Sequence, residues 1–200
     1  MDALRKNWVP LVIALAVIAV VAVLLFWPGK SKLDFKMQNL DGETVTLGNT
    51  SGKARLVYFY FGHCPDVCLG TNYLLSQVQE GLKEAGVFGN KTLLLSITFD
   101  PERDTTEYLK EYSSRMEADS SGWYFLRDDD VEKSRKLAEA YGVSIIPDGD
   151  NFIHANLFTL LDGKGKVQKV YSPNEVLVIN PDKREEFIEQ IVQDMVSLVK

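Results

Sequence analysis

The chain has 200 residues, of which 46% are hydrophobic and 25% are charged, as in an ordinary folded domain. Its net charge of −6 comes without a basic patch, so we expect no nucleic acid among its partners. The two cysteines are too few for a disulfide-rich scaffold. With only two histidines as well, a zinc site of Cys and His alone would need all four side chains.

The N-terminal segment predicts a membrane anchor. Residues 8–27 carry no charged or polar side chain, and a helix of that length spans about 30 Å, the thickness of the hydrocarbon core of a bilayer. Trp8 and Trp27 suit the two interfaces, while Arg5 and Lys6 favour a cytoplasmic N-terminus. A cleaved signal peptide is the alternative, but no A-x-A-like cleavage site follows the apolar segment.

This reading divides the chain into a cytoplasmic N-terminus at residues 1–7, a transmembrane anchor at 8–27, a tether at 28–33 and a folded domain at 34–200. We expect a single-pass protein of the bacterial inner membrane, with its domain on the exported, periplasmic side. In that oxidising compartment a pair of thiols becomes a disulfide unless a reductant or a metal intervenes.

The pattern of residues 34–200 predicts one α/β domain. An N-terminal β-hairpin at 34–47 turns at Asp41-Gly42, and a second hairpin joins 156–161 to 167–171. Further strands are expected at 55–61, 92–99 and 124–126. Helices are expected at 67–85, from Thr105, at 131–141 and from about residue 180. The apolar face of the first comprises Leu69, Tyr73, Leu74, Val78 and Leu82. Such alternation predicts a central sheet with helices on both faces and ligand sites at the carboxyl ends of its parallel strands.

The two cysteines lie where the first buried strand passes into a helix. Cys64 and Cys68 are four residues apart, so both thiols can lie on one helical face, which permits either a disulfide or joint capture of a metal. Pro65 suits the first helical turn, and the free N–H groups there stabilise a thiolate. Inert buried cysteines are the alternative, but the order strand, Cys-Pro-x-x-Cys, helix favours functional ones.

A second loop, Asp100-Pro-Glu-Arg-Asp104, follows the next buried strand. Asp104 and Glu107 have the spacing of a capping box, so Asp104 is expected to cap the following helix. Arg103 is expected to pair with a neighbouring carboxylate. We therefore expect a structural role for this loop at the rim of the site.

His154 is the candidate third ligand. In thioredoxin-like folds the residue that enters the C-terminal hairpin faces the cysteine pair, and redox enzymes have a cis-proline there. Ile153-His154-Ala155 occupies that place here. A histidine bonded within the core is the alternative, and His63 is the competing ligand, although neighbours in sequence often point apart. Two thiolates and one imidazole suit copper, either as three-coordinate Cu(I) or as Cu(II) with a further ligand.

Three blocks of the exported domain resemble the Sco family, also called SenC, of copper chaperones. They are HCPDVC at 63–68, DPERDT at 100–105, and AYGV before an irregular loop and His154. The resemblance implies a thioredoxin-like fold and copper bound by Cys64, Cys68 and His154. It also implies delivery of copper or electrons to the dinuclear copper site of the copper-bearing subunit of cytochrome c oxidase. It does not identify the copper donor.

The chain departs from the family pattern at two positions. Leu69 stands where the family usually has proline, and Ile153 stands where it usually has aspartate before the histidine. The second change removes a carboxylate that would orient the imidazole or contact a partner. It therefore affects the Cu(II) state and copper delivery more than the Cu(I) state.

A thiol–disulfide oxidoreductase is the alternative function. Its catalytic residues would be Cys64 and Cys68, and its substrate would be the cysteines of an oxidase subunit or another exported protein. Three residues rather than two separate the cysteines, and a histidine replaces the cis-proline, which favours copper. Pro147, which follows YGVS at 141–144, would support the alternative if it were cis and packed on Cys64.

Overall fold

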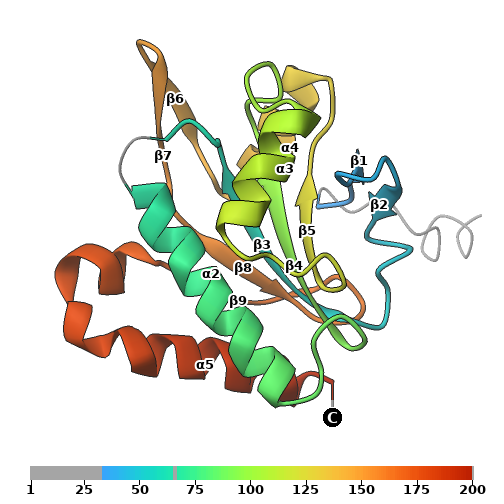
Figure 1. Ribbon diagram of the computed structural model, residues 1–200, viewed down its shortest axis with the longest axis vertical. Helices are drawn as coiled ribbons and strands as arrows, with labels where there is room; N and C mark the ends of the chain where they lie inside the picture. The colour runs from blue at the N-terminus through green and yellow to red at the C-terminus, as the bar shows by residue number, and fades with distance from the viewer. Residues whose placement is uncertain (1–32, 65–66, 200) are drawn as a thin grey trace, which may run out of the picture. The chain divides into compact units, whose positions relative to one another are not determined.

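The structure is a computed structural model that describes residues 33–64 and 67–199, without the side chains of residues 67–69 (Figure 1). The predicted anchor at 8–27 lies outside these residues. Within the described part, no helix has both the length and the apolar character needed to cross a membrane.

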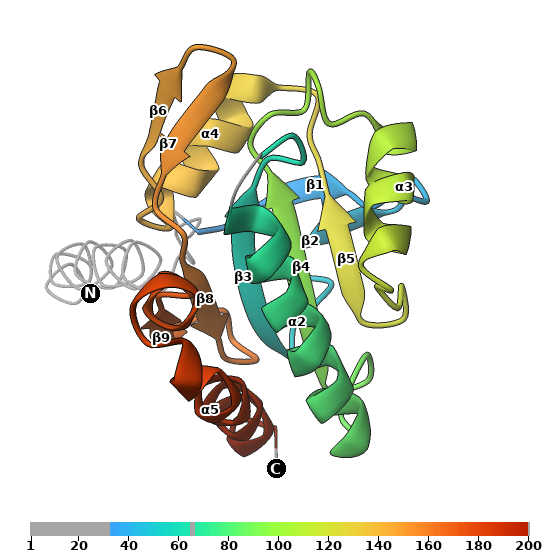
Figure 2. The same ribbon diagram turned by 60° about the vertical axis from the view of Figure 1, so that its left-hand side comes forward.

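A five-stranded mixed sheet forms the centre of the domain. Its strand order is β5-β4-β3-β8-β9, with β3, β4 and β5 parallel and with β8 antiparallel to both of its neighbours (Figure 2). The bounds are Ala54–Tyr60 for β3, Thr92–Thr98 for β4, Trp123–Leu126 for β5, Phe158–Leu161 for β8 and Val167–Tyr171 for β9. Every residue of β3 and β4 is buried, so these two strands are covered on both faces.

Two hydrophobic clusters cover the two faces of the sheet. Leu56, Tyr58 and Tyr60 of β3 belong to one cluster, while Val57 and Phe59 belong to the other, as a period of two requires. The first cluster includes residues of α2 (Val67–Glu84), α3 (Thr106–Arg115) and α5 (Arg184–Ser197). Figure 2 shows α2 in front of the sheet and α3 beside β5. The second includes residues of α4 (Val131–Ala140) and of the hairpin β1 (Lys36–Gln38) and β2 (Thr44–Thr46).

The expected α/β architecture is confirmed. The predicted strands and helices are present with boundaries shifted by a few residues, and the N-terminal hairpin turns at Gly42, whose φ of 81° suits glycine. A π-helical turn, Glu175–Ile179, and a 3-10 turn, Pro181–Lys183, connect β9 to α5 and were not predicted. The expected buried face of α2 was wrong at Tyr73, which is 52% exposed, because the buried stripe runs through Leu74, Leu75, Val78 and Leu82.

The segment before His154 also differs from the expected irregular loop. It forms a hairpin of β6 (Ile145–Asp148) and β7 (Asn151–His154), in which Asp148 pairs with Asn151 across a two-residue turn. Gly149 is the first turn residue and has a φ of 59°, a conformation that glycine adopts without strain. This hairpin is a separate two-stranded sheet that ends at His154.

The packing of α5 gives a first testable prediction. Ile191 is 0% exposed within the first cluster, so Ile191→Ala should lower the free energy of unfolding by about 2–5 kcal/mol in urea denaturation of the folded domain. Ile179 is 70% exposed, and the same change there should cost less than about 0.5 kcal/mol. Equal losses from the two substitutions would contradict the placement of α5.

Candidate functional site

The candidate site lies where the parallel strands β3 and β4 end. The loop after β3 leads to Cys64, and the first backbone bond beyond the ladder joins Phe99 N to Tyr60 O at 3.0 Å. Cys64 is half-buried and packs against the second hydrophobic cluster. Cys68 lies in the first turn of α2, and its side chain is outside the described atoms. The relation between the two thiols therefore stays a prediction.

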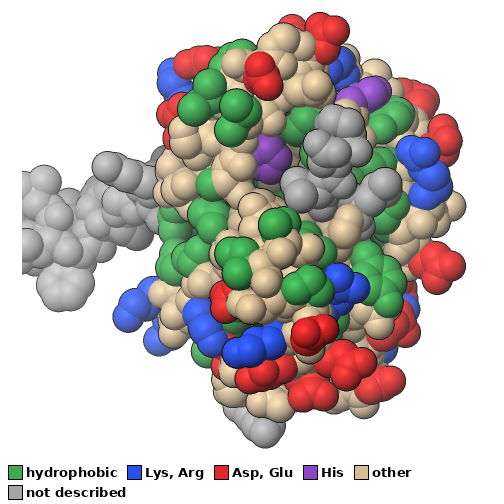
Figure 3. Space-filling view, turned by 90° about the vertical axis from the view of Figure 1, so that its left-hand side faces the viewer, with side chains coloured by type: hydrophobic (Ala, Val, Ile, Leu, Met, Phe, Trp, Pro, Cys, Tyr) green, Lys and Arg blue, Asp and Glu red, His purple; other side chains and the backbone are tan. Residues whose placement is uncertain are grey.

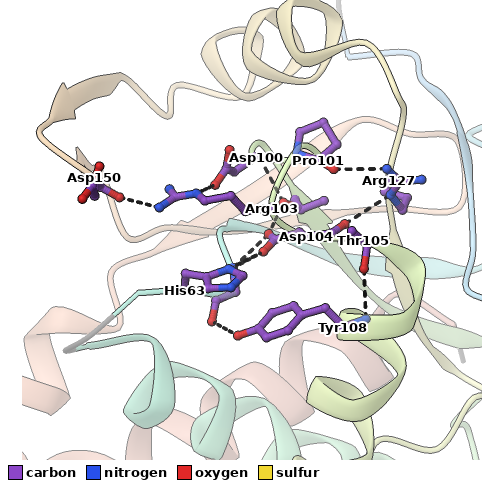
Figure 4. Close-up of polar contacts among 11 residues, drawn as sticks. His63, Asp100, Pro101, Arg103, Asp104, Thr105, Tyr108, Arg127 and Asp150 are labelled. Carbon is purple, nitrogen blue, oxygen red and sulfur yellow. Dashed lines mark hydrogen bonds and ion pairs between the residues drawn. The ribbon is translucent and has the colours of Figure 1, made fainter.

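Asp104 holds the loop that leads to Cys64. Its carboxylate has no exposed area and accepts the Gly62 N–H at 3.1 Å on Oδ1 and 2.9 Å on Oδ2 (Figure 4). Oδ2 also accepts the Thr98 hydroxyl at 2.5 Å. The Tyr108 hydroxyl donates to the Gly62 carbonyl at 2.7 Å, so both polar groups of Gly62 are held. A Cβ on Gly62 would lie 2.5 Å from a Tyr108 ring carbon, which explains why glycine is needed here.

The expected capping role of Asp104 was wrong. Thr105 is the N-cap of α3, and its hydroxyl accepts the Tyr108 N–H at 3.2 Å. Asp104 points into the loop instead, where burial raises the pKa of its carboxyl and hydrogen bonds from Thr98, Gly62 and His63 oppose that rise. The expected ion pair of Arg103 is present: its Nε lies 2.5 Å from Asp100 Oδ2.

His63 is held on the α3 side of the loop. Its Nδ1 lies 3.2 Å from Asp104 Oδ1, and its ring stacks on Tyr108 with the centroids 4.2 Å apart. These contacts hold the His63 ring beside the site, and its ranking behind His154 as a ligand stays a prediction. A hollow of about 280 Å³, lined in part by Cys64 and Arg115, lies next to this stack.

His154 is half-buried at the end of β7, and its ring lies against aromatic side chains. The ring centroid is 5.1 Å from that of Phe99 and 6.0 Å from that of Phe61. Both phenylalanines belong to the second hydrophobic cluster, against which Cys64 also packs, so Cys64 and His154 adjoin the same cluster. Figure 3 shows histidine side chains at two places on one face of the molecule.

The protonation of His154 suits a ligand. Its Nδ1 lies 3.2 Å from the Ala155 carbonyl, and because a carbonyl only accepts, this bond requires the proton on Nδ1 and leaves a lone pair on Nε2. Burial lowers the pKa of His154 below its ordinary value, which favours the neutral imidazole. A neutral imidazole with a free lone pair is the form that binds metals.

The structure brings together part of the predicted site. Among the described side chains, no three His, Cys, Asp or Glu residues are close enough to hold a metal, and this set does not contain Cys68. Pro147 is exposed within β6, and no peptide bond of the described residues is cis. The condition that would have favoured a thioredoxin-like reductase is therefore not met. Sequence reasoning missed the roles of Gly62 and Tyr108, although a glycine directly before His-Cys was an available signal.

Comparisons with known proteins identify the family. The family model described as SCO1/SenC matches residues 28–193. The chain belongs to the SCO1/SenC family. The mitochondrial SCO1 homolog 1 of Arabidopsis thaliana is 36% identical over 86 residues, which are 41% of this chain and 25% of that protein. The SCO2-like protein of Rickettsia felis is 28% identical over 151 residues, 72% of each chain.

Solved structures confirm the thioredoxin-type fold. ScoI of Arabidopsis thaliana, solved with copper bound, has a TM-score of 0.63 and 26% identity, covering 80% of this chain and 97% of its own. BsSco, described as a Sco-family cytochrome c oxidase assembly protein with a disulfide switch, has a TM-score of 0.69 and 26% identity, covering 83% and 91%. The copper and the switch are properties of those proteins.

The corrected role of Asp104 is testable by mutation. Asp104→Ala removes the acceptor of two buried donors, Gly62 N–H and Thr98 hydroxyl, and should lower the free energy of unfolding by at least about 1–3 kcal/mol in urea. Glu107→Ala should change it by less than about 0.5 kcal/mol, since Glu107 is exposed. A larger effect at Glu107 than at Asp104 would restore the capping box.

Proposed function

We propose that this protein is a membrane-anchored copper metallochaperone that helps to assemble the dinuclear copper centre of cytochrome c oxidase. Its ligands are the thiolates of Cys64 and Cys68 and the Nε2 atom of His154. The observation that carries the proposal is the position of His154, whose ring lies against Phe61 and Phe99 of the hydrophobic cluster on which Cys64 also packs. Family members with bound copper and with a role in oxidase assembly support it.

The donor set fits copper by its chemistry. Thiolates are the soft ligands that select Cu(I), and two of them offset the charge of the ion in a partly buried site. The Ala155 carbonyl fixes the tautomer and the orientation of His154, which is one role that a carboxylate at position 153 would serve. Ile153, which stands there instead, is 60% exposed and offers no hydrogen bond.

A membrane anchor at residues 8–27 completes the proposal. It places the domain, residues 34–200, on the exported side of a bacterial inner membrane, beside the copper-bearing subunit of the oxidase. Reduction of cysteines on that subunit is the second candidate activity, with Cys64 and Cys68 as the redox pair. The exposed Pro147 lends that activity no support, so we rank copper transfer first.

Copper titration under anaerobic conditions tests the ligand set. The reduced exported domain should bind one Cu(I), and Cys64→Ala or Cys68→Ala should abolish stoichiometric binding because the remaining donors are poor ligands for Cu(I). His154→Ala should spare much of the Cu(I) affinity but remove the Cu(II)–thiolate absorption, since Cu(II) requires further nitrogen or oxygen donors.

The matched control is His63→Ala, because the His63 ring is already bonded to Asp104 and stacked on Tyr108. It should leave both copper states unchanged. Loss of the Cu(II) absorption in His63→Ala, with the signal retained in His154→Ala, would show that the wrong histidine was assigned. Unchanged copper binding in the double cysteine variant would refute the proposed site.

Oxidation should control copper loading. A disulfide between Cys64 and Cys68 would leave no thiolate for the metal, so the oxidised domain should take up copper only after reduction. Bound copper should in turn protect both thiols from alkylation. Mass spectrometry of alkylated samples, with and without copper and oxidant, measures both effects. Stoichiometric copper on a protein with an intact disulfide would rule this mechanism out.

A further inference from the structure

We propose that Arg103 is a positioning residue for His154: it fastens the β6–β7 hairpin to the loop between β4 and α3. The inference rests on the proposed function in one respect, which is that His154 is a copper ligand. The attachment itself is a property of the metal-free protein, and the two can fail separately.

Strand pairing does not tie the hairpin to the central sheet. Among the described strands, β6 and β7 pair with each other and form a separate two-stranded sheet. Phe152 of β7 packs the hairpin against the second hydrophobic cluster. Its ring centroid lies 5.2 Å from that of Phe61 and 5.5 Å from that of Phe99. His154 lies against the same two rings, so a shift of the hairpin would also move the imidazole relative to Phe61 and Phe99.

Arg103 contacts the hairpin at its turn and at strand β7. Its Nη1 donates to the carbonyl of the turn residue Asp150 at 2.5 Å (Figure 4). Its guanidinium carbon lies 5.4 Å from the ring centroid of Phe152. Its Nε donates to the carboxylate of Asp100. The side chain of Asp100 is only 4% exposed, so this ion pair anchors the Arg103 side chain to the loop. The planar fork of arginine can reach both acceptors at once and still stack on a ring.

The same loop holds the other half of the site. Asp104 binds the Gly62 N–H, two residues before Cys64, and Thr98 links Asp104 to Asp100 by donating to the first and accepting the N–H of the second. The loop 100–105 is thus a common support: Asp104 holds the segment with Cys64, and Arg103 holds the hairpin with His154. Arg103 also lies 5.7 Å from the ring centroid of Phe61, but its hydrogen bond to the hairpin has no counterpart there, so loss of Arg103 should disturb the imidazole more than Cys64.

The test compares Arg103→Ala with Arg135→Ala in the metal-free domain. Arg135 is the matched control: it lies 5.1 Å from the centroid of Phe152 but, among the described contacts, makes no hydrogen bond to Asp150. Amide exchange in β6 and β7 should accelerate at least about tenfold in Arg103→Ala, as expected when a hydrogen bond from a charged donor is lost, and stay unchanged in α5. Arg135→Ala should change it less than about threefold, since only stacking is removed.

The position of the imidazole has its own readout. The ring protons of His154 lie in the ring currents of Phe61 and Phe99, so their chemical shifts should move in Arg103→Ala while those of His63 stay in place. Arg103→Lys keeps the charge but reaches only one of the two acceptors, and it should give an intermediate shift. With copper added, Arg103→Ala should alter the Cu(II) spectrum and leave the Cu(I) affinity within about threefold.

Two results would overturn the inference: unchanged exchange in β6 and β7, or faster exchange there with unmoved His154 ring protons. Should the wild-type domain bind no copper, the proposed function fails, while the exchange rates and proton shifts still decide the role of Arg103.

Discussion

The buried carboxylate of Asp104 is the constraint on which the site depends. A carboxylate without exposed area is costly unless donors surround it, and here the donors come from Gly62, Thr98 and His63. Two of them belong to the loop after β3 and one to the end of β4. The carboxylate therefore finds all of its donors only when the ends of β3 and β4 lie side by side. This arrangement positions the loop that leads to Cys64.

The sheet topology then brings His154 to the same edge. Because β3 and β4 are parallel and in register, their carboxyl ends lie together. β8 runs antiparallel to β3 and pairs Phe158 with Tyr58, so the chain entering β8 arrives at the carboxyl end of β3. His154 lies four residues before Phe158, at the point of entry. A strand reversal thus joins two segments that are about 90 residues apart in sequence.

Features that depend on neighbouring residues could be predicted from the sequence, whereas those that depend on residues far apart along the chain could not. The runs 55–61 and 92–99 were predicted because burial on both faces leaves a continuous apolar pattern, and the last helix because its stripe repeats. Asp104 was misassigned because the capping box is a local pattern, whereas its actual partner Gly62 is 42 residues away. The β6–β7 hairpin was missed because it is short, exposed and contains Pro147, so no core periodicity marks it.

Under the proposed ligand set, the two thiolates and the imidazole are held by different parts of the structure. Both cysteines belong to one segment: Cys64 follows Gly62, whose N–H Asp104 binds, and Cys68 lies in the first turn of α2. The imidazole comes from a hairpin outside the central sheet, held by Arg103 and Phe152. Since Cu(I) is satisfied by thiolates and Cu(II) requires the imidazole, a small displacement of the hairpin changes the relative affinity for the two oxidation states.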